Sequence, residues 1–254
     1  MNDPDSGQAA PCIHILGVRV DDVDLAEAVP RILAMAASRR PHHVVTVNPE
    51  FVMLARRDPA FREVLERADL ALPDGIGLLH AARVLGRPLR GRATGVDTVL
   101  ALVDAAAEHQ ISFFLLGGQP GVAEAAAARL VTRQPRLRIA GTYAGSPSPD
   151  EEDEIVERIR RAAPDYLFVA YGAPQQDLWI ARNLQRLGVP VAMGVGGVFD
   201  YVSGRVPWAP AAWRRLGLEW LYRLMHQPWR WRRMLALPRF ALAVLAARLR
   251  GGQT

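Results

Sequence analysis

The sequence predicts an α/β fold: a mainly parallel sheet with helices on both faces, a Rossmann-like arrangement, followed by a helical appendage rich in Arg and Trp. Three observations support this prediction. Short apolar runs alternate with helical segments for roughly 180 residues, which is typical of βαβ units. Glycine turns follow several of these runs. After about Gly204 the strand signals end, and Trp, Pro and Arg accumulate.

The apolar runs place the strands. The segment 44–47 is short and β-branched, as expected for a buried strand, and 112–116 is strongly apolar. The complete set of predicted strands is 13–18, 44–47, 70–72, 112–116, 138–142, 166–170 and 189–195.

Capping residues and prolines place the helices between these strands. Asp22 or Asp24 can begin the first helix, and acids at 150–152 suit the first turn of a later one. The predicted helices end near Ser38, Arg57, Arg67, Leu85, Glu108, Arg133, Ala162 and Leu187. We therefore expect a disordered leader (1–11), an α/β core (12–203) and a membrane-associating appendage (204–254).

Composition narrows the class of protein. The chain has 254 residues, is 50% hydrophobic and has a formal net charge of +5. All its basic side chains are Arg, and ten of them lie between Arg205 and Arg250 with a single acid, Glu219. Cys12 is the only cysteine, so an intramolecular disulfide or a Cys-based zinc site is excluded. We expect no metal, no cofactor, no transmembrane helix and no signal peptide.

Two predicted strands end in polar residues beside a helix start. Thr46 and Asn48 lie where the strand 44–47 ends, and Asp74 follows 70–72 between Pro73 and Gly75. Asp before Gly is also a routine turn or cap residue. Because ligands of open α/β sheets bind outside the carboxyl ends of the strands, we interpret Asp74 as the candidate catalytic base.

Three glycine turns after strands predict a nucleotide-type cleft, since their N–H groups can approach a phosphate. None matches a dinucleotide fingerprint, and each alone could be a plain tight turn. Arg92, in a Gly-rich loop, can bind a diphosphate as a bidentate donor or be a solvated surface residue. The candidate binding residues of the turns are Gly117, Gly118, Gln119, Tyr171, Gly172, Gln176, Gly196 and Asp200.

The C-terminal region mixes five Trp residues with its arginines. Trp rings at headgroup level and Arg on anionic lipid favour a membrane surface. A helix packed on the core with a solvated basic face is the alternative, and nucleic-acid binding is the least favoured, because no known nucleic-acid module is recognisable.

Seven motifs, in order along residues 13–240, resemble the WecG/TagA/CpsF glycosyltransferases, glycosyltransferase family 26. They begin at Thr46 (TVNPE), Pro73 (PDGIG), Arg92 (RATGVD), Phe114 (FLLGGQPG), Tyr171 (YGAPQQD), Gly194 (GVGGVFD) and Leu218 (LEWLYR).

The resemblance implies an inverting, metal-independent bacterial hexosyltransferase. Its donor would be a UDP-sugar, such as UDP-N-acetylmannosamine or its uronic acid, and its acceptor a polyprenyl-diphosphate-linked saccharide for cell-surface polysaccharide. It implies Asp74 and Thr46 as the catalytic residues, Asp74 as the base and Thr46 as a donor- or acceptor-binding residue, with Asn48, Arg92 and Gln176 as further polar residues of the pocket. It also implies an appendage that docks on the inner face of the cell membrane and helps close the site. The candidate arginines of that appendage are Arg214, Arg215, Arg223, Arg230 and Arg233.

Two departures from the family pattern stand out. Gln175-Gln176-Asp177 replaces a usual Lys-Gln-Glu, which is conservative. Pro207-Trp208 replaces a usual basic pair before Ala-Pro, which removes positive charge near the appendage.

Two other functions are weighed against the transferase. A nucleotide-cofactor oxidoreductase on the same fold would need the missing dinucleotide fingerprint. A non-catalytic membrane-binding module leaves the polar strand ends unexplained. The sequence leaves open the transferred sugar, the linkage and a homo-oligomeric state.

Overall fold

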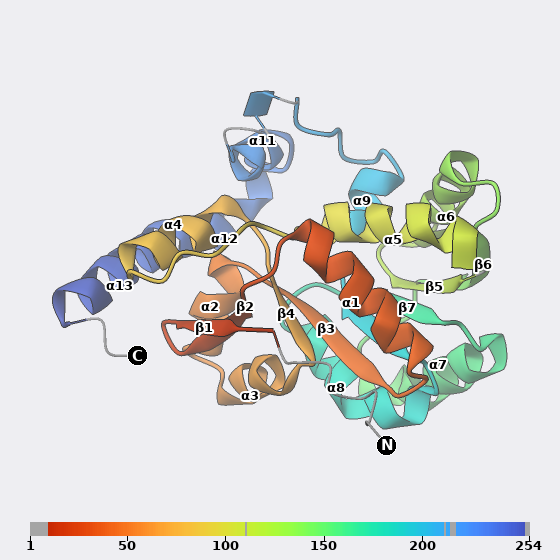
Figure 1. Cartoon of the computed structure of the whole chain (residues 1–254). Helices are drawn as coiled ribbons and strands as arrows, with labels where there is room; N and C mark the ends of the chain where they lie inside the picture. The colour runs from red at the N-terminus through yellow and green to blue at the C-terminus, as the bar shows by residue number, and fades with distance from the viewer. Residues whose placement is uncertain (1–9, 110, 211, 214–216, 252–254) are drawn as a thin grey trace, which may run out of the picture.

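The computed structural model describes residues 10–109, 111–210, 212–213 and 217–251, and a six-stranded parallel sheet forms its centre (Figure 1). Across the sheet the strands are β4 (Leu70–Pro73), β3 (His42–Val47), β8 (Val191–Gly194), β7 (Tyr166–Ala170), β5 (Ser112–Gly117) and β6 (Arg138–Tyr143). All five strand pairs are parallel, so every carboxyl end lies at the same edge of the sheet. This order confirms the predicted Rossmann-like α/β fold.

The strands are apolar throughout because both faces of the sheet are covered. In β5, Phe113 and Leu115 belong to one core, whereas Phe114 and Leu116 belong to the core on the opposite face. The first face is covered by α1 (Leu25–Ala37), α5 (Gly95–His109), α6 (Val122–Arg133) and α9 (Val198–Val202). The second is covered by α2 (Pro49–Ala55), α3 (Pro59–Arg67), α4 (Ile76–Val84), α7 (Pro149–Ala162) and α8 (Gln175–Leu187).

Side-chain caps begin the first three helices. Asp24, Asn48 and Asp58 each accept a hydrogen bond from the backbone N–H three residues ahead, at 3.0–3.1 Å. Pro49 and Pro59 follow two of these caps, at a position where a missing N–H costs nothing. Of the two caps predicted for the first helix, Asp22 and Asp24, the structure uses Asp24, and α1 continues in spite of Pro30 inside it.

The predicted strand 13–18 is wrong. Two short antiparallel strands, β1 (Cys12–Ile15) and β2 (Val18–Asp21), form a separate hairpin instead. Leu16 and Gly17 join them, both with positive φ (52° and 80°), which is the conformation of a two-residue hairpin turn. The largely apolar sequence of residues 13–18 concealed this turn. Ahead of the hairpin, Ala10 is buried, and residues 1–9 of the predicted leader lie outside the described part of the chain.

The appendage consists of α11 (Glu219–His226), a 3-10 turn η1 (Pro228–Arg230), α12 (Trp231–Met234) and α13 (Ala236–Leu249). In Figure 1 α13 lies along α4 while α11 stands at the top of the view, and α13 packs against both α4 and α2. Phe240 and Val244 of α13 are buried in the same core as α2 and α4, whereas Leu242 is 68% exposed. No helix among the described residues is long and apolar enough to cross a membrane.

This packing predicts a contrast in stability between two positions of α13. Phe240→Ala should lower the free energy of unfolding by about 3–5 kcal/mol, because a buried ring is lost and a cavity remains. Leu242→Ala, on the exposed side of the same helix, should change it by less than about 0.5 kcal/mol. Urea unfolding of the full chain measures both values. Equal effects at the two positions would mean that α13 is not seated on the core in this way.

Candidate functional site

Asp74 and Thr46 lie together at the carboxyl ends of β4 and β3. Thr46 is buried, and its hydroxyl donates to the Gly194 carbonyl at 3.4 Å. The Asp74 carboxylate accepts from the Gly95 N–H, also at 3.4 Å. A Cβ built on Gly95 would lie 3.4 Å from the Thr46 methyl and 3.8 Å from Asp74 Oδ2, so Gly95 leaves space between these two side chains. The structure therefore brings the two predicted catalytic residues together.

The Asp74 carboxyl has an unusual proton affinity. Burial raises its pKa from the ordinary 3.8 to about 7, because the charged form has lost water and, among the described residues, has gained one long hydrogen bond, from Gly95. Glu219 and Asp97 raise the pKa further as like charges, while Arg92 lowers it. A carboxyl with a pKa near neutrality can take up a proton at physiological pH, as a general base must.

The appendage reaches this site through the start of α11. Glu219 Oε1 lies 3.8 Å from Nη2 of Arg92, in the loop that leads to α5. Just before α11, a Cβ on Gly217 would lie 2.5 Å from Cγ2 of Ile76, the residue two positions after Asp74. A segment more than 140 residues distant in sequence from Asp74 thus covers the end of β4.

Three predicted appendage arginines, Arg223, Arg230 and Arg233, lie in α11 and the two short helices after it. The Arg223 guanidinium lies 4.7 Å from the centroid of the Tyr201 ring, 3.6 Å from Asp200 Oδ2 and directly against Gly197. Arg233 binds both carboxylate oxygens of Glu50, at 2.6 and 2.9 Å.

Burial and the nearby Arg223 and Arg233 lower the pKa of Arg230, which lies between them in sequence, to about 10. We call Arg223, Arg230 and Arg233 the arginine cluster. Three cations that repel one another in partly desolvated positions suit a multiply charged anion. Arg214 and Arg215 fall outside the described residues.

Gln176 joins two of the predicted glycine turns. It is buried, and its Oε1 accepts from the N–H of Gly172 at 3.2 Å and from that of Gly196 at 2.9 Å. The side-chain oxygen is thus engaged within the protein, and it fixes the loops after β7 and β8 relative to each other. Similarly, the Asn48 oxygen is occupied as the cap of α2. Both predicted binding residues have their oxygens engaged in shaping the site.

The remaining predicted residues are spread along the sheet edge. Gly117 and Gly118 follow β5; a Cβ on Gly117 would lie 2.8 Å from the backbone carbon of Ala170, so only glycine fits there. Gln119 is exposed in the same turn. The Tyr171 side chain turns away, because its ring packs edge-on against Trp179 in the core beneath α7 and α8. Within the part of the chain that the structure describes, its hydroxyl has no hydrogen-bond partner.

Sequence reasoning missed a buried pair beneath the site. His43 Nε2 lies 3.5 Å from Oδ1 of Asp177, and both side chains are almost fully buried. Asp177 lies directly against Gly194, whose carbonyl accepts from Thr46. Glu219, Gly95 and Tyr201 were missed as well. The only available signal was that Glu219 is the single acid among the C-terminal arginines.

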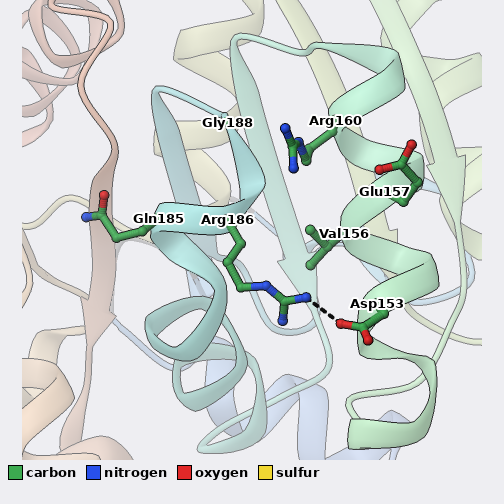
Figure 2. Close-up of a pocket in the computed structure, with 7 residues that line it drawn as sticks. All are labelled: Asp153, Val156, Glu157, Arg160, Gln185, Arg186 and Gly188. Carbon is green, nitrogen blue, oxygen red and sulfur yellow. Dashed lines mark hydrogen bonds and ion pairs between the residues drawn. The ribbon is translucent and has the colours of Figure 1, made fainter.

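A surface hollow of about 460 Å³ lies elsewhere, between α7 and α8 (Figure 2). Its lining is largely charged and outward-facing, and Arg186 and Asp153 pair across it. None of the strand-end residues lines this hollow, so we assign no site to it. Among the described residues, no three His, Cys, Asp or Glu side chains are grouped as a metal site requires.

The fold and the strand-end site define a class of protein: an α/β enzyme with a carboxyl of near-neutral pKa at the strand ends and an appendage that carries a cluster of arginines. Comparison with known proteins gives the family. Residues 13–254 match the Glycosyl transferase WecG/TagA/CpsF family, and the chain belongs to that family of glycosyltransferases.

Two relatives carry the same name, N-acetylglucosaminyldiphosphoundecaprenol N-acetyl-beta-D-mannosaminyltransferase. The protein of Bacillus spizizenii is 38% identical over 202 residues, which cover 80% of this chain and 78% of the relative. The protein of Staphylococcus aureus is 32% identical over 239 residues, 93% of each chain. These matches confirm the resemblance read from the motifs and decide against the oxidoreductase and the non-catalytic membrane module.

The raised pKa of Asp74 predicts a pH-dependent stability difference for Asp74→Asn. Below pH 4 the carboxyl is neutral in both folded and unfolded chains, so the variant should match the wild type. Between pH 4 and about 7 only the unfolded chain ionises, which progressively destabilises the wild type. Above pH 7 the variant should therefore be more stable, on the order of 1–3 kcal/mol. Urea unfolding across this pH range measures the difference; a constant difference would contradict the raised pKa.

Proposed function

We propose that this glycosyltransferase transfers an N-acetylmannosaminyl or related hexosyl group from a UDP-sugar to a saccharide linked to polyprenyl diphosphate. The names of the relatives support the acceptor and the sugar. The observation that carries the proposal is the Asp74 carboxyl, with a pKa of about 7, next to Thr46 at the carboxyl edge of the sheet and below the appendage.

Asp74 is the base in this proposal. Its ionised carboxylate takes the proton of the acceptor hydroxyl while that oxygen forms a bond to the anomeric carbon of the donor sugar. The bond from the anomeric carbon to UDP breaks on the opposite face, and UDP leaves with the electron pair. Proton, bond and leaving group balance in a single inverting displacement that uses one carboxylate and no covalent intermediate.

The leaving diphosphate needs positive charge or N–H donors as the bond breaks. Arg92 stands beside Asp74, and Arg223 lies over the glycine turn after β8, against Gly197. Arg230 and Arg233 continue the arginine cluster from there. These groups supply the stabilisation that a divalent cation gives in other transferases, so the proposed reaction is independent of metal.

The appendage also supplies a surface for the lipid. Leu242, Leu245 and Leu249 project from α13 on the side away from Phe240 and Val244, and Leu249 is 88% exposed. Arg239 and Arg248 belong to the same helix, and Arg250 directly follows its end. Apolar side chains bordered by arginines suit the interface of an anionic membrane. We place the enzyme on the cytoplasmic face of the cell membrane, held peripherally by this face of α13.

The proposal is tested by incubating the full chain with UDP-N-acetylmannosamine and a short-chain polyprenyl-diphosphate N-acetylglucosamine, in EDTA, and measuring UDP release and glycosylated lipid. Transfer is expected to persist without metal. Asp74→Asn should lose roughly two to four decades of rate. The ratio kcat/KM should fall as the pH falls through about 7, because Asp74 must be ionised to accept a proton.

Asp104→Asn is the matched control, since this carboxylate pairs with Arg133 on the surface of α5. It should transfer at the wild-type rate. Wild-type activity in Asp74→Asn would exclude Asp74 as the base. A strict requirement for a divalent cation would exclude the metal-independent reaction.

Docking has a separate prediction. Joint substitution of Leu242, Leu245 and Leu249 by Ser should reduce binding to phosphatidylglycerol vesicles at least about tenfold, since a buried Leu contributes about 1.5–3 kcal/mol. Turnover of the short-chain acceptor in solution should not change, because none of these residues contacts the site. Val131→Ser, an exposed position on α6, is the control. Unaltered vesicle binding in the triple variant would show that another surface docks.

A further inference from the structure

Glu219 is the single acidic residue of the appendage, and its carboxylate lies next to an arginine of the core. It opens α11, and its carboxylate faces Arg92 at 3.8 Å. Four residues on, Arg223 lies on the same side of α11, as this spacing requires, and contacts Asp200, Tyr201 and Gly197. One side of a single helical turn thus touches both the loop before α5 and the start of α9.

Charges reach Asp74 from three elements. Glu219 comes from α11, Asp97 from the first turn of α5 and Arg92 from the loop between α4 and α5; the Gly95 N–H also acts on Asp74. Asp97 is held in place by the Thr94 hydroxyl, which donates to it at 2.7 Å. Glu219 is therefore the one negative charge near Asp74 whose position depends on the appendage.

We propose that Glu219 is a positioning residue of the transfer reaction: it seats α11 over the strand ends and holds Arg92 where the donor diphosphate binds. This inference rests on the proposed function. It makes the appendage part of the chemistry and not only a membrane anchor, because its position determines the charge around the base. Glu219 acts through Arg92 and Asp74 and does not contact the reacting atoms.

The charges of Glu219 and Arg92 have opposite effects on the pKa of Asp74. Glu219 opposes the ionisation of Asp74 by like-charge repulsion, and it offsets Arg92, which favours ionisation. Removing the negative charge should therefore lower the pKa of Asp74. The acid limb of the pH profile of kcat/KM, which reports the free enzyme, should move to lower pH.

The experiment compares Glu219→Gln with wild type in two measurements. In the transfer assay, the acid limb should shift to lower pH, and the KM for UDP-sugar should rise roughly fivefold, the upper end of what an exposed ion pair contributes. Glu219→Asp, which keeps the charge, should restore most of the limb position. In parallel, 13C NMR titration of the Asp74 carboxyl, assigned by its absence in Asp74→Asn, should show the same downward shift.

Glu50→Gln is the matched control, because it removes another ion pair of the appendage, that with Arg233, and leaves the pair of Glu219 with Arg92 intact. It should not move the Asp74 titration, since Glu50 is not among the charges that act on Asp74. An unshifted carboxyl titration in Glu219→Gln, or an equal shift in Glu50→Gln, would overturn the inference. Loss of transfer in the wild type would instead overturn the proposed function, and the titration would still decide the role of Glu219.

Discussion

The Asp74 carboxylate stands at the end of β4 with few groups to replace the water it has lost. Its single backbone donor is at 3.4 Å, and two carboxylates act on it as like charges. Burial without compensation is costly, and structures retain it where a function requires it. The surroundings of Asp74 reflect this cost: Gly75, with φ of 98°, turns the chain sharply after it, and Gly95 leaves room for its side chain beside Thr46.

A base of high proton affinity and a site for a multiply charged anion make opposing demands. Cations placed around Asp74 would lower its pKa and weaken it as a base. In this structure the acids that pair with the arginine cluster are others: Arg223 lies near Asp200 and the Tyr201 ring, and Arg233 binds Glu50. Arg92, the cation nearest the base, is itself offset by Glu219. The protein thus keeps strong positive charge close to the site while limiting its effect on the base.

The sequence was informative where function depends on local pattern. Alternating apolar runs and caps such as Asp24 predicted the strands and helices, because burial on two faces and orphan N–H groups leave their mark over a few residues. The sequence did not predict the turn at Leu16, because an apolar residue gives no indication that its φ is positive. The sequence also did not predict the directions of side chains. Thr46 lies near the end of β3 and Tyr171 directly follows β7, but the Tyr171 ring packs into the core against Trp179. The pairing of Arg92 with Glu219 joins positions that only the folded chain brings together.

The C-terminal helices show why the sequence offered a membrane surface and a packed tail as alternatives. One side of α13 is packed on the core, and the other side is apolar and exposed. Phe240 and Val244 join the core, while Leu242, Leu245 and Leu249 remain outside, and an apolar helix without a clear polar face cannot be divided this way from its composition. The packed side contacts α2, and Glu50 of α2 binds Arg233, so α13 and the arginine cluster rest on the same helix of the core. A membrane bound to α13 would therefore steady the same segment that carries Glu219 and Arg223 over the site.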